Sequence, residues 1–146
     1  MIVPHLIEGD VFVDDRGTVS FVNDFSLDPA RRFYMVENHS AGFVRAWHYH
    51  AKETKYVLAV AGSAIVAAVH VTNVEEPDSD SEIYRFVLSA KKPSILLIPP
   101  EYAHGTKNLT DDTRIMFFSN ATLEESSADD IRYDAEMWDP WDVLSR

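Results

Sequence analysis

Two histidines alternate in the segment from residue 44 to residue 50, and this spacing is suited to acid–base or metal chemistry. Successive side chains of a strand point to opposite faces, so His48 and His50 would share a face with Val44 and Ala46. Trp47 would point the other way. Imidazoles that share one space are candidate bases or metal ligands, and two plain surface histidines are the open alternative.

A second polar segment, residues 99–108, extends this pattern. The two segments together resemble the cupin motifs G-x5-H-x-H-x(3,4)-E-x6-G and G-x5-P-x-G-x2-H-x3-N. The matching positions are Gly42, His48, His50, Gly62, Pro99, His104 and Asn108. This resemblance implies an all-β fold, a cupin-type jelly-roll β-barrel with a short C-terminal helical or irregular segment.

Lys55 stands where the cupin motif has its glutamate, and this change alters the expected chemistry. A cupin metal site uses three neutral imidazoles and a carboxylate, whereas an ammonium has no lone pair to donate. We therefore expect no metal and no other cofactor, but a base and a cation. The alternatives are a non-catalytic sugar-binding cupin and a metal-binding cupin in sugar metabolism. The metal ligands would then be His48, His50, His104 and Glu53.

Further segments resemble the dTDP-4-dehydrorhamnose 3,5-epimerases. Residues 12–17 are similar to F-x-D-x-R-G, residues 45–49 to R-G-L-H-Y, residues 55–57 to K-L-V, residues 99–105 to P-x-G-F-A-H-G, and residues 131–140 to I-x-W-x-D-P. The resemblance implies an isomerase in which His48 is the base, Asp134 is the partner of its imidazole and Lys55 stabilises an enolate. The candidate substrate contacts are Arg16, Arg45, His104 and Asn108.

Proton transfer next to a ketone gives these residue types a physical role. It requires a neutral imidazole near the C–H bond and a positive group near the carbonyl oxygen, which His48 and Lys55 can supply. A carboxylate such as Asp134 would fix the imidazole tautomer, with Asp129, Asp130 and Asp139 as rivals. Strand alternation places Arg45 on the face opposite His48 unless a bulge intervenes.

Two departures separate the chain from the epimerase pattern. The epimerases have tyrosines in the segment that corresponds to residues 117–123, where this chain has none. They also have glutamine where this chain has His50. The dTDP-sugar 3,4-ketoisomerases are similar small cupins with R-G-x-H-x-H, and their chemistry can use His48 and His50 without that tyrosine. We expect an isomerase or epimerase of a dTDP-4-keto-6-deoxy sugar, with isomerisation favoured.

Length, composition and charge indicate the number of domains, the partners and the location of the protein. The chain has 146 residues, of which 46% are hydrophobic, and this length predicts a single domain over residues 1–146. A formal charge of −11 would repel a phosphate backbone, so we expect no nucleic-acid partner. No cysteine and no long apolar run occurs, and we expect a cytoplasmic protein that does not bind membranes. An exchanged edge strand or N-terminal segment is usual in the resembling family, which implies a homodimer.

Short apolar or alternating segments must position these residues. They predict strands over residues 18–22, 33–37, 44–50, 55–61, 64–70, 83–88, 94–98 and 115–119. Gly62 can supply the positive φ of a tight hairpin between the fourth and fifth strands. Apolar residues at three- or four-residue spacing predict a helix over residues 123–137.

Overall fold

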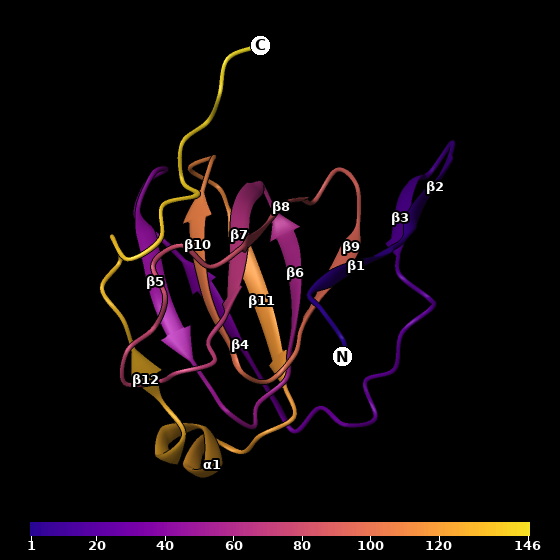
Figure 1. The fold of residues 1–146 in the computed structure, drawn as a ribbon. Helices are drawn as coiled ribbons and strands as arrows, with labels where there is room; N and C mark the ends of the chain where they lie inside the picture. The colour runs from indigo at the N-terminus through magenta and orange to yellow at the C-terminus, as the bar shows by residue number, and fades with distance from the viewer.

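The computed structural model describes residues 1–146, which form two facing antiparallel sheets (Figure 1). One sheet has the order β1-β9-β6-β11-β4, and the other has the order β12-β5-β10-β7-β8. Strands β2 and β3 form a separate hairpin. The bounds are β1 His5–Glu8, β2 Asp10–Asp14, β3 Gly17–Phe21, β4 Arg32–Glu37, β5 Val44–Tyr49, β6 Lys55–Ala61, β7 Ser63–His70, β8 Ile83–Ser89, β9 Ser94–Ile98, β10 Tyr102–Asn108, β11 Arg114–Ser119, α1 Leu123–Ala128 and β12 Ile131–Arg132. The all-β jelly-roll prediction is confirmed, although the two sheets do not close into one continuous barrel.

The eight predicted strands correspond to β3 to β9 and β11, within one residue at each end. Gly62 joins β6 to β7 with a φ of +66°, as the hairpin requires. The long C-terminal helix is wrong, because α1 ends at Ala128 and β12 then pairs with β5. Of the later apolar residues, Ile131 belongs to β12 and Trp138 packs in a hydrophobic cluster, so their spacing does not mark a helix.

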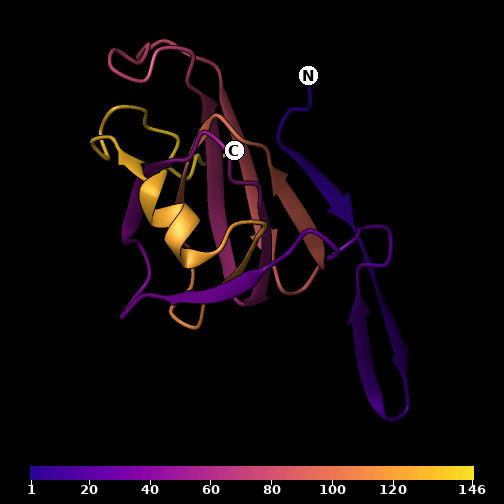
Figure 2. The ribbon, with the colours of Figure 1, turned by 90° about the horizontal axis from the view of Figure 1, so that it is seen from below.

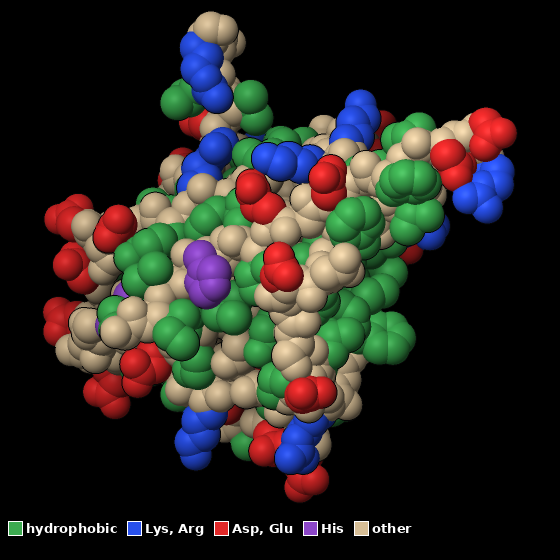
Figure 3. Space-filling model, turned by 90° about the vertical axis from the view of Figure 1, so that its right-hand side faces the viewer, with side chains coloured by type: hydrophobic (Ala, Val, Ile, Leu, Met, Phe, Trp, Pro, Cys, Tyr) green, Lys and Arg blue, Asp and Glu red, His purple; other side chains and the backbone are tan.

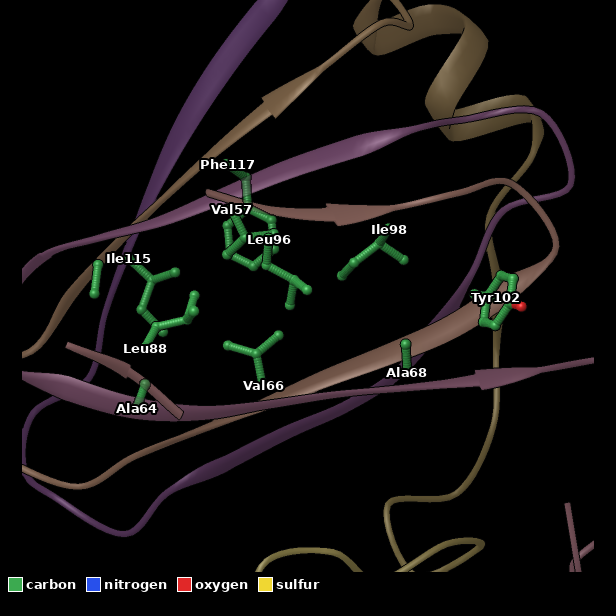
Figure 4. Packing of buried hydrophobic residues seen from close by; sticks show 11 residues of the cluster. Val57, Ala64, Val66, Ala68, Leu88, Leu96, Ile98, Tyr102, Ile115 and Phe117 are labelled. Atoms are coloured by element: carbon green, nitrogen blue, oxygen red, sulfur yellow. The ribbon is translucent and has the colours of Figure 1, made fainter. Parts of the chain in front are cut away.

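Two hydrophobic clusters hold the sheets in place. The first fills the space between the sheets, where Val57, Leu96 and Phe117 point toward Val66 and Ala68 (Figure 4). The second lies on the outer face of the β5–β10–β7 sheet under the C-terminal segment. Its members include Trp47, Tyr49, Ile65, Val69, Trp138 and Trp141. Strand β7 is therefore buried on both faces.

Tryptophans form the centre of this second cluster. Trp138 packs edge-on against Trp47 with ring centroids 5.2 Å apart, and Trp141 lies 5.3 Å from Trp47. Trp47 is fully buried, so these aromatic rings belong to the core. Burying one face of β5 in this way leaves its other face for the interior between the sheets.

The β2–β3 hairpin projects away from the two sheets (Figure 2). Its apolar side chains are open to solvent, with Phe12 56%, Val13 66% and Val19 60% exposed. The one helix, α1, has six residues and falls far short of the length that spans a membrane.

Candidate active site

A cavity of about 390 Å³ lies between the two sheets, and each sheet supplies a different chemistry to it. The imidazoles of His48 on β5, of His50 directly after β5 and of His104 on β10 line one side. Lys55 on β6 and Tyr34 on β4 line the other side. The structure thus brings together the histidines and the lysine that the sequence singled out.

Strand pairing fixes the positions of the three imidazoles. His104 lies directly opposite His48 in the β10–β5 ladder. The ring centroid of His104 is 5.8 Å from that of His48 and 6.4 Å from that of His50. All three imidazoles line the cavity.

A β-bulge in β5 brings Arg45 to the same cavity. His48 pairs with His104, but Arg45 pairs with Thr106, so β5 has one residue more than β10 in this interval. The extra residue reverses the alternation of side chains along β5. Arg45 therefore lines the cavity, as expected if a bulge intervenes. Val44 and Ala46 consequently pack with the outer cluster, which corrects the prediction that they share a face with His48.

Burial keeps the three imidazoles neutral. It lowers the pKa of His104 well below 6.5, and the nearby Lys55 charge lowers it further. Burial likewise lowers the pKa of His48, with help from the Arg132 charge. The pKa of His50 is lowered by burial although the Glu53 carboxylate opposes this shift. At neutral pH each ring can therefore accept a proton.

Lys55 and Glu53 form a buried ion pair below the histidines. Lys55 Nζ lies 2.5 Å from Glu53 Oε1 and donates to Tyr34 Oη at 2.9 Å. Burial opposes the charge of Glu53, yet hydrogen bonds from Lys55, Ser119 and Ser126 outweigh burial and lower its pKa. Burial lowers the pKa of Lys55, and the same carboxylate opposes that shift. The pair is held charged by its partners rather than by water.

Tyr34 is a functional candidate that the sequence did not reveal. Its ring stacks on Phe117 at 4.9 Å, and burial together with the Glu53 charge raises the pKa of its hydroxyl. Alternation in the predicted strand 33–37 puts Tyr34 and Val36 on one face, but apolar Phe33 and Met35 occupy the other face. The pattern therefore gave no sign of which face is internal.

Charged residues at the mouth of the cavity were also missed. The cavity is also lined by Arg32 on β4, by Asp130 just before β12 and by Arg132 on β12. Asp130 accepts a hydrogen bond from Arg132 at 3.2 Å. The strand β12 brings both to the cavity, and a two-residue strand leaves no periodic pattern in a sequence.

Three predicted site residues lie outside this cavity. Asp134 is exposed and accepts a hydrogen bond from the backbone of Glu136, so the structure does not place it beside His48. Arg16 lies in the projecting hairpin, where its side chain is 84% exposed and pairs with Asp14. Asn108 is buried at the end of β10, where it donates to the carbonyl of Ser40.

The carboxylate rivals named for Asp134 have separate positions. Asp129 accepts hydrogen bonds from the backbone N–H groups of Ala51 and Lys52. Asp139 is exposed on the C-terminal segment, and Asp130 is the one acidic rival that lines the cavity.

The metal alternative is not favoured by the arrangement of donors. Glu53, its fourth ligand, already accepts from Lys55 and two serines. No group of three or more histidine, aspartate or glutamate side chains has the geometry of a metal site.

Comparisons with known proteins identify the family of the chain. The sequence model of a family described as dTDP-4-dehydrorhamnose 3,5-epimerase matches residues 4–145. A search of curated proteins gave no significant match.

Solved structures show the same fold. The dTDP-4-dehydrorhamnose 3,5-epimerase of Bacillus anthracis str. Ames, solved with TDP and PPi bound, has 22% identity and a TM-score of 0.76, and the match covers 97% of this chain and 86% of that one. An epimerase from Mycobacterium tuberculosis has 21% identity and a TM-score of 0.73, with 88% and 68% covered. A sugar 3,4-ketoisomerase from Thermoanaerobacterium thermosaccharolyticum, in complex with TDP, has 16% identity and a TM-score of 0.68, with 92% and 90% covered.

Proposed function

Because this chain belongs to the dTDP-4-dehydrorhamnose 3,5-epimerase family, we propose that it is an isomerase acting on a dTDP-4-keto-6-deoxy sugar. The observation that supports this most is the single cavity in which three neutral imidazoles face a buried ammonium. The reaction needs no metal or other cofactor. A cytoplasmic location, expected from the sequence, stays a prediction.

The two sides of the cavity suit the two demands of the reaction. An imidazole takes the proton from the carbon next to the ketone, and the C–H electron pair moves into a new C=C bond while the carbonyl oxygen becomes an enolate. The Lys55 ammonium donates a hydrogen bond to that oxygen, where the negative charge develops. Return of a proton to carbon then regenerates the ketone.

The position of Tyr34 bears on the stereochemical outcome. Its hydroxyl lies on the sheet opposite the histidines and beside Lys55, so it can protonate the enolate from the other face. That step would invert the carbon, as an epimerase does. Delivery of the proton to the neighbouring carbon C4 by a histidine on the original side, while the C3 hydroxyl loses its proton and becomes the carbonyl, would instead move the ketone, as a ketoisomerase does. Both remain within the proposal.

Cations at the cavity suit an anionic nucleotide sugar. Arg32, Arg45 and Arg132 line it in a chain whose formal charge is −11. Convergent guanidinium groups can bind a diphosphate locally despite the negative mean field. TDP in the structures of similar proteins agrees with such a substrate.

A homodimer that exchanges its β2–β3 hairpin is part of the proposal. The hairpin extends away from its own sheets with exposed Phe12 and Val19 opposite each other in the ladder (Figure 2). Hydrophobic side chains also gather on the side of the molecule that carries β1, β2 and β3 (Figure 3). In such a dimer Arg16 would contact substrate in the cavity of the partner.

Deuterium exchange tests the proposed function. The protein is incubated with dTDP-4-keto-6-deoxyglucose in D2O, and the sugar is analysed by NMR. Label at C3 and C5 would indicate double epimerisation, and a 3-keto product would indicate ketoisomerisation. The absence of exchange with every nucleotide keto-sugar tried would contradict the proposal.

A further inference from the structure

Glu53 contacts both the lysine and one of the histidines of the cavity. Its side chain is 1% exposed, and Oε1 accepts hydrogen bonds from Lys55 and Ser119, each at 2.5 Å. Oε2 accepts from Ser126 at 2.8 Å and lies 3.2 Å from Nδ1 of His50. One buried carboxylate thus joins the cation of one sheet to an imidazole of the other.

The contact with His50 defines where the proton of that ring belongs. Nδ1 of His50 is buried and has no well-aligned hydrogen bond, although Oε2 of Glu53 is within ion-pair distance. An ionised carboxylate only accepts hydrogen bonds, so the ring nitrogen that faces it is stabilised as N–H. The other nitrogen, Nε2, then keeps its lone pair for the cavity that His50 lines.

His48 and His104 have no equivalent partner. Among the three cavity histidines, only His50 has a carboxylate oxygen within ion-pair distance. The charged groups that affect the pKa of His48 most are Arg132, which lowers it, and Asp130, which raises it. His104 faces the positive Lys55 without a carboxylate at ion-pair distance.

We propose that Glu53 is the positioning residue of this site, which holds the proton of His50 on Nδ1 and keeps Lys55 as an ammonium. This inference rests on the proposed function and narrows it, because Nε2 of His50 becomes the base. The substrate proton moves to Nε2, and Glu53 stays ionised and stabilises the resulting imidazolium. The serines and Lys55 hold the carboxylate in place, so it does not need to move during the reaction.

Nitrogen NMR of the free protein tests the inference without any substrate. The 15N shifts of His50 report its tautomer and its pKa, and we expect the Nδ1–H form in the native protein. The groups that face His50 are Glu53, Lys55, His48, His104, Asp129 and Asp130. His50 with its proton on Nε2 would overturn the proposal.

Two substitutions, one of Glu53 and one of its hydrogen-bond donor Ser126, should shift the pKa of His50 in opposite directions. Glu53→Gln removes the acceptor charge, so we expect loss of the Nδ1–H preference and a lower pKa of His50. Ser126→Ala keeps the charge but removes one of its donors, so we expect the Nδ1–H form to persist with a higher pKa of His50. Glu124→Gln, an exposed position on the same helix, is the matched control. Equal shifts in all three variants would overturn the proposal, and Ser126→Ala remains informative if Glu53→Gln does not fold.

Turnover provides a second measurement. In Glu53→Gln we expect kcat for proton exchange to fall by about 10²-fold or more, the usual contribution of acid–base catalysis. Glu53 raises the pKa of both His50 and Lys55, so its loss should move both limbs of the kcat/KM pH profile to lower pH. A purely structural role would lower activity without moving either limb, and that result would overturn the proposal. If the native protein exchanges no proton at all, the proposed function fails while the tautomer of His50 still decides the role of Glu53.

Discussion

A buried ammonium needs a buried counter-charge, and Lys55 finds it two residues away in Glu53. Desolvation of either group alone would cost several kcal/mol. Together they stay charged because Lys55 also donates a hydrogen bond to Tyr34, and Glu53 also accepts hydrogen bonds from Ser119 and Ser126. The same pairing occupies the carboxylate that a metal site would require. At the scale of single residues, Glu53 belongs to a charged pair and is not free to act as a fourth metal ligand.

Neutral histidines make the stability of the protein depend on pH. The pKa of folded His104 lies well below 6.5, mainly because of burial, so the unfolded chain binds a proton first as the pH falls. The contribution of neutral His104 to the free energy of unfolding should therefore be fully present above about pH 6.5 and decrease below it. His104 alone should contribute a slope of up to about 1.4 kcal/mol per pH unit in this range. Denaturant unfolding at a series of pH values between about 7 and 5 measures the slope.

His104→Gln removes this contribution and should flatten the slope below about pH 6.5 by up to that amount. His39→Gln at an exposed position is the control substitution. An identical slope in the native protein and in His104→Gln would contradict the prediction.

Alternation in β5 made half of the site predictable from the sequence. It correctly placed His48 and His50 on the face opposite Trp47, and the spacing of the motifs brought in His104 and Lys55. The rest depended on features that leave no local pattern. The direction of Arg45 depends on a bulge, and Tyr34 faces inward only because its strand packs against a second sheet.

The elements that the sequence did not predict have weak patterns for identifiable reasons. Strand β10 combines glycine, histidine and other polar residues, because its inner face lines the cavity and its outer face packs under Trp141. Strand β12 has two residues, and its pairing with β5 ends the helix that apolar spacing had predicted to continue. Long-range packing for β10 and backbone pairing with β5 for β12, not local propensity, determined these outcomes.

Helix α1 begins with a capping box that fixes one rim of the cavity. The Thr122 hydroxyl accepts from the backbone N–H of Glu125, and the Glu125 carboxylate accepts from the backbone of Thr122. The helix in turn places Ser126 against Glu53. We expect Thr122→Ala to lower the free energy of unfolding by about 1 kcal/mol, because the first turn loses its cap. Chemical denaturation measures this change.

Thr122→Ser retains the hydroxyl and should restore most of the stability that Thr122→Ala loses. Unfolding curves for Thr122→Ala that match those of the native protein would show that the capping box does not stabilise this helix.

The distribution of charge and of exposed apolar surface links the molecule to its partners. The overall charge is −11, yet the cavity between the sheets gathers three arginines and a lysine. The projecting hairpin adds Arg16 at a distance from that cavity, with apolar side chains on both strands. Arg16 lies on a hairpin that extends away from the rest of its own chain, and this arrangement suits a site shared between two subunits.

Mixing two inactive variants tests whether the hairpin is exchanged. Arg16→Ala damages the hairpin and His50→Asn damages the cavity, so each homodimer should have little activity. A heterodimer with exchanged hairpins contains one cavity with intact His50 from one chain and intact Arg16 from the other. Co-refolding the two variants should therefore recover activity that neither has alone, measured as deuterium exchange into the keto-sugar. Mixing His50→Asn with Lys55→Met is the control, because both changes lie in the cavity and every site then keeps one defect. Recovery in neither mixture, although native mass spectrometry shows that heterodimers form, would mean that Arg16 does not act in the partner's cavity.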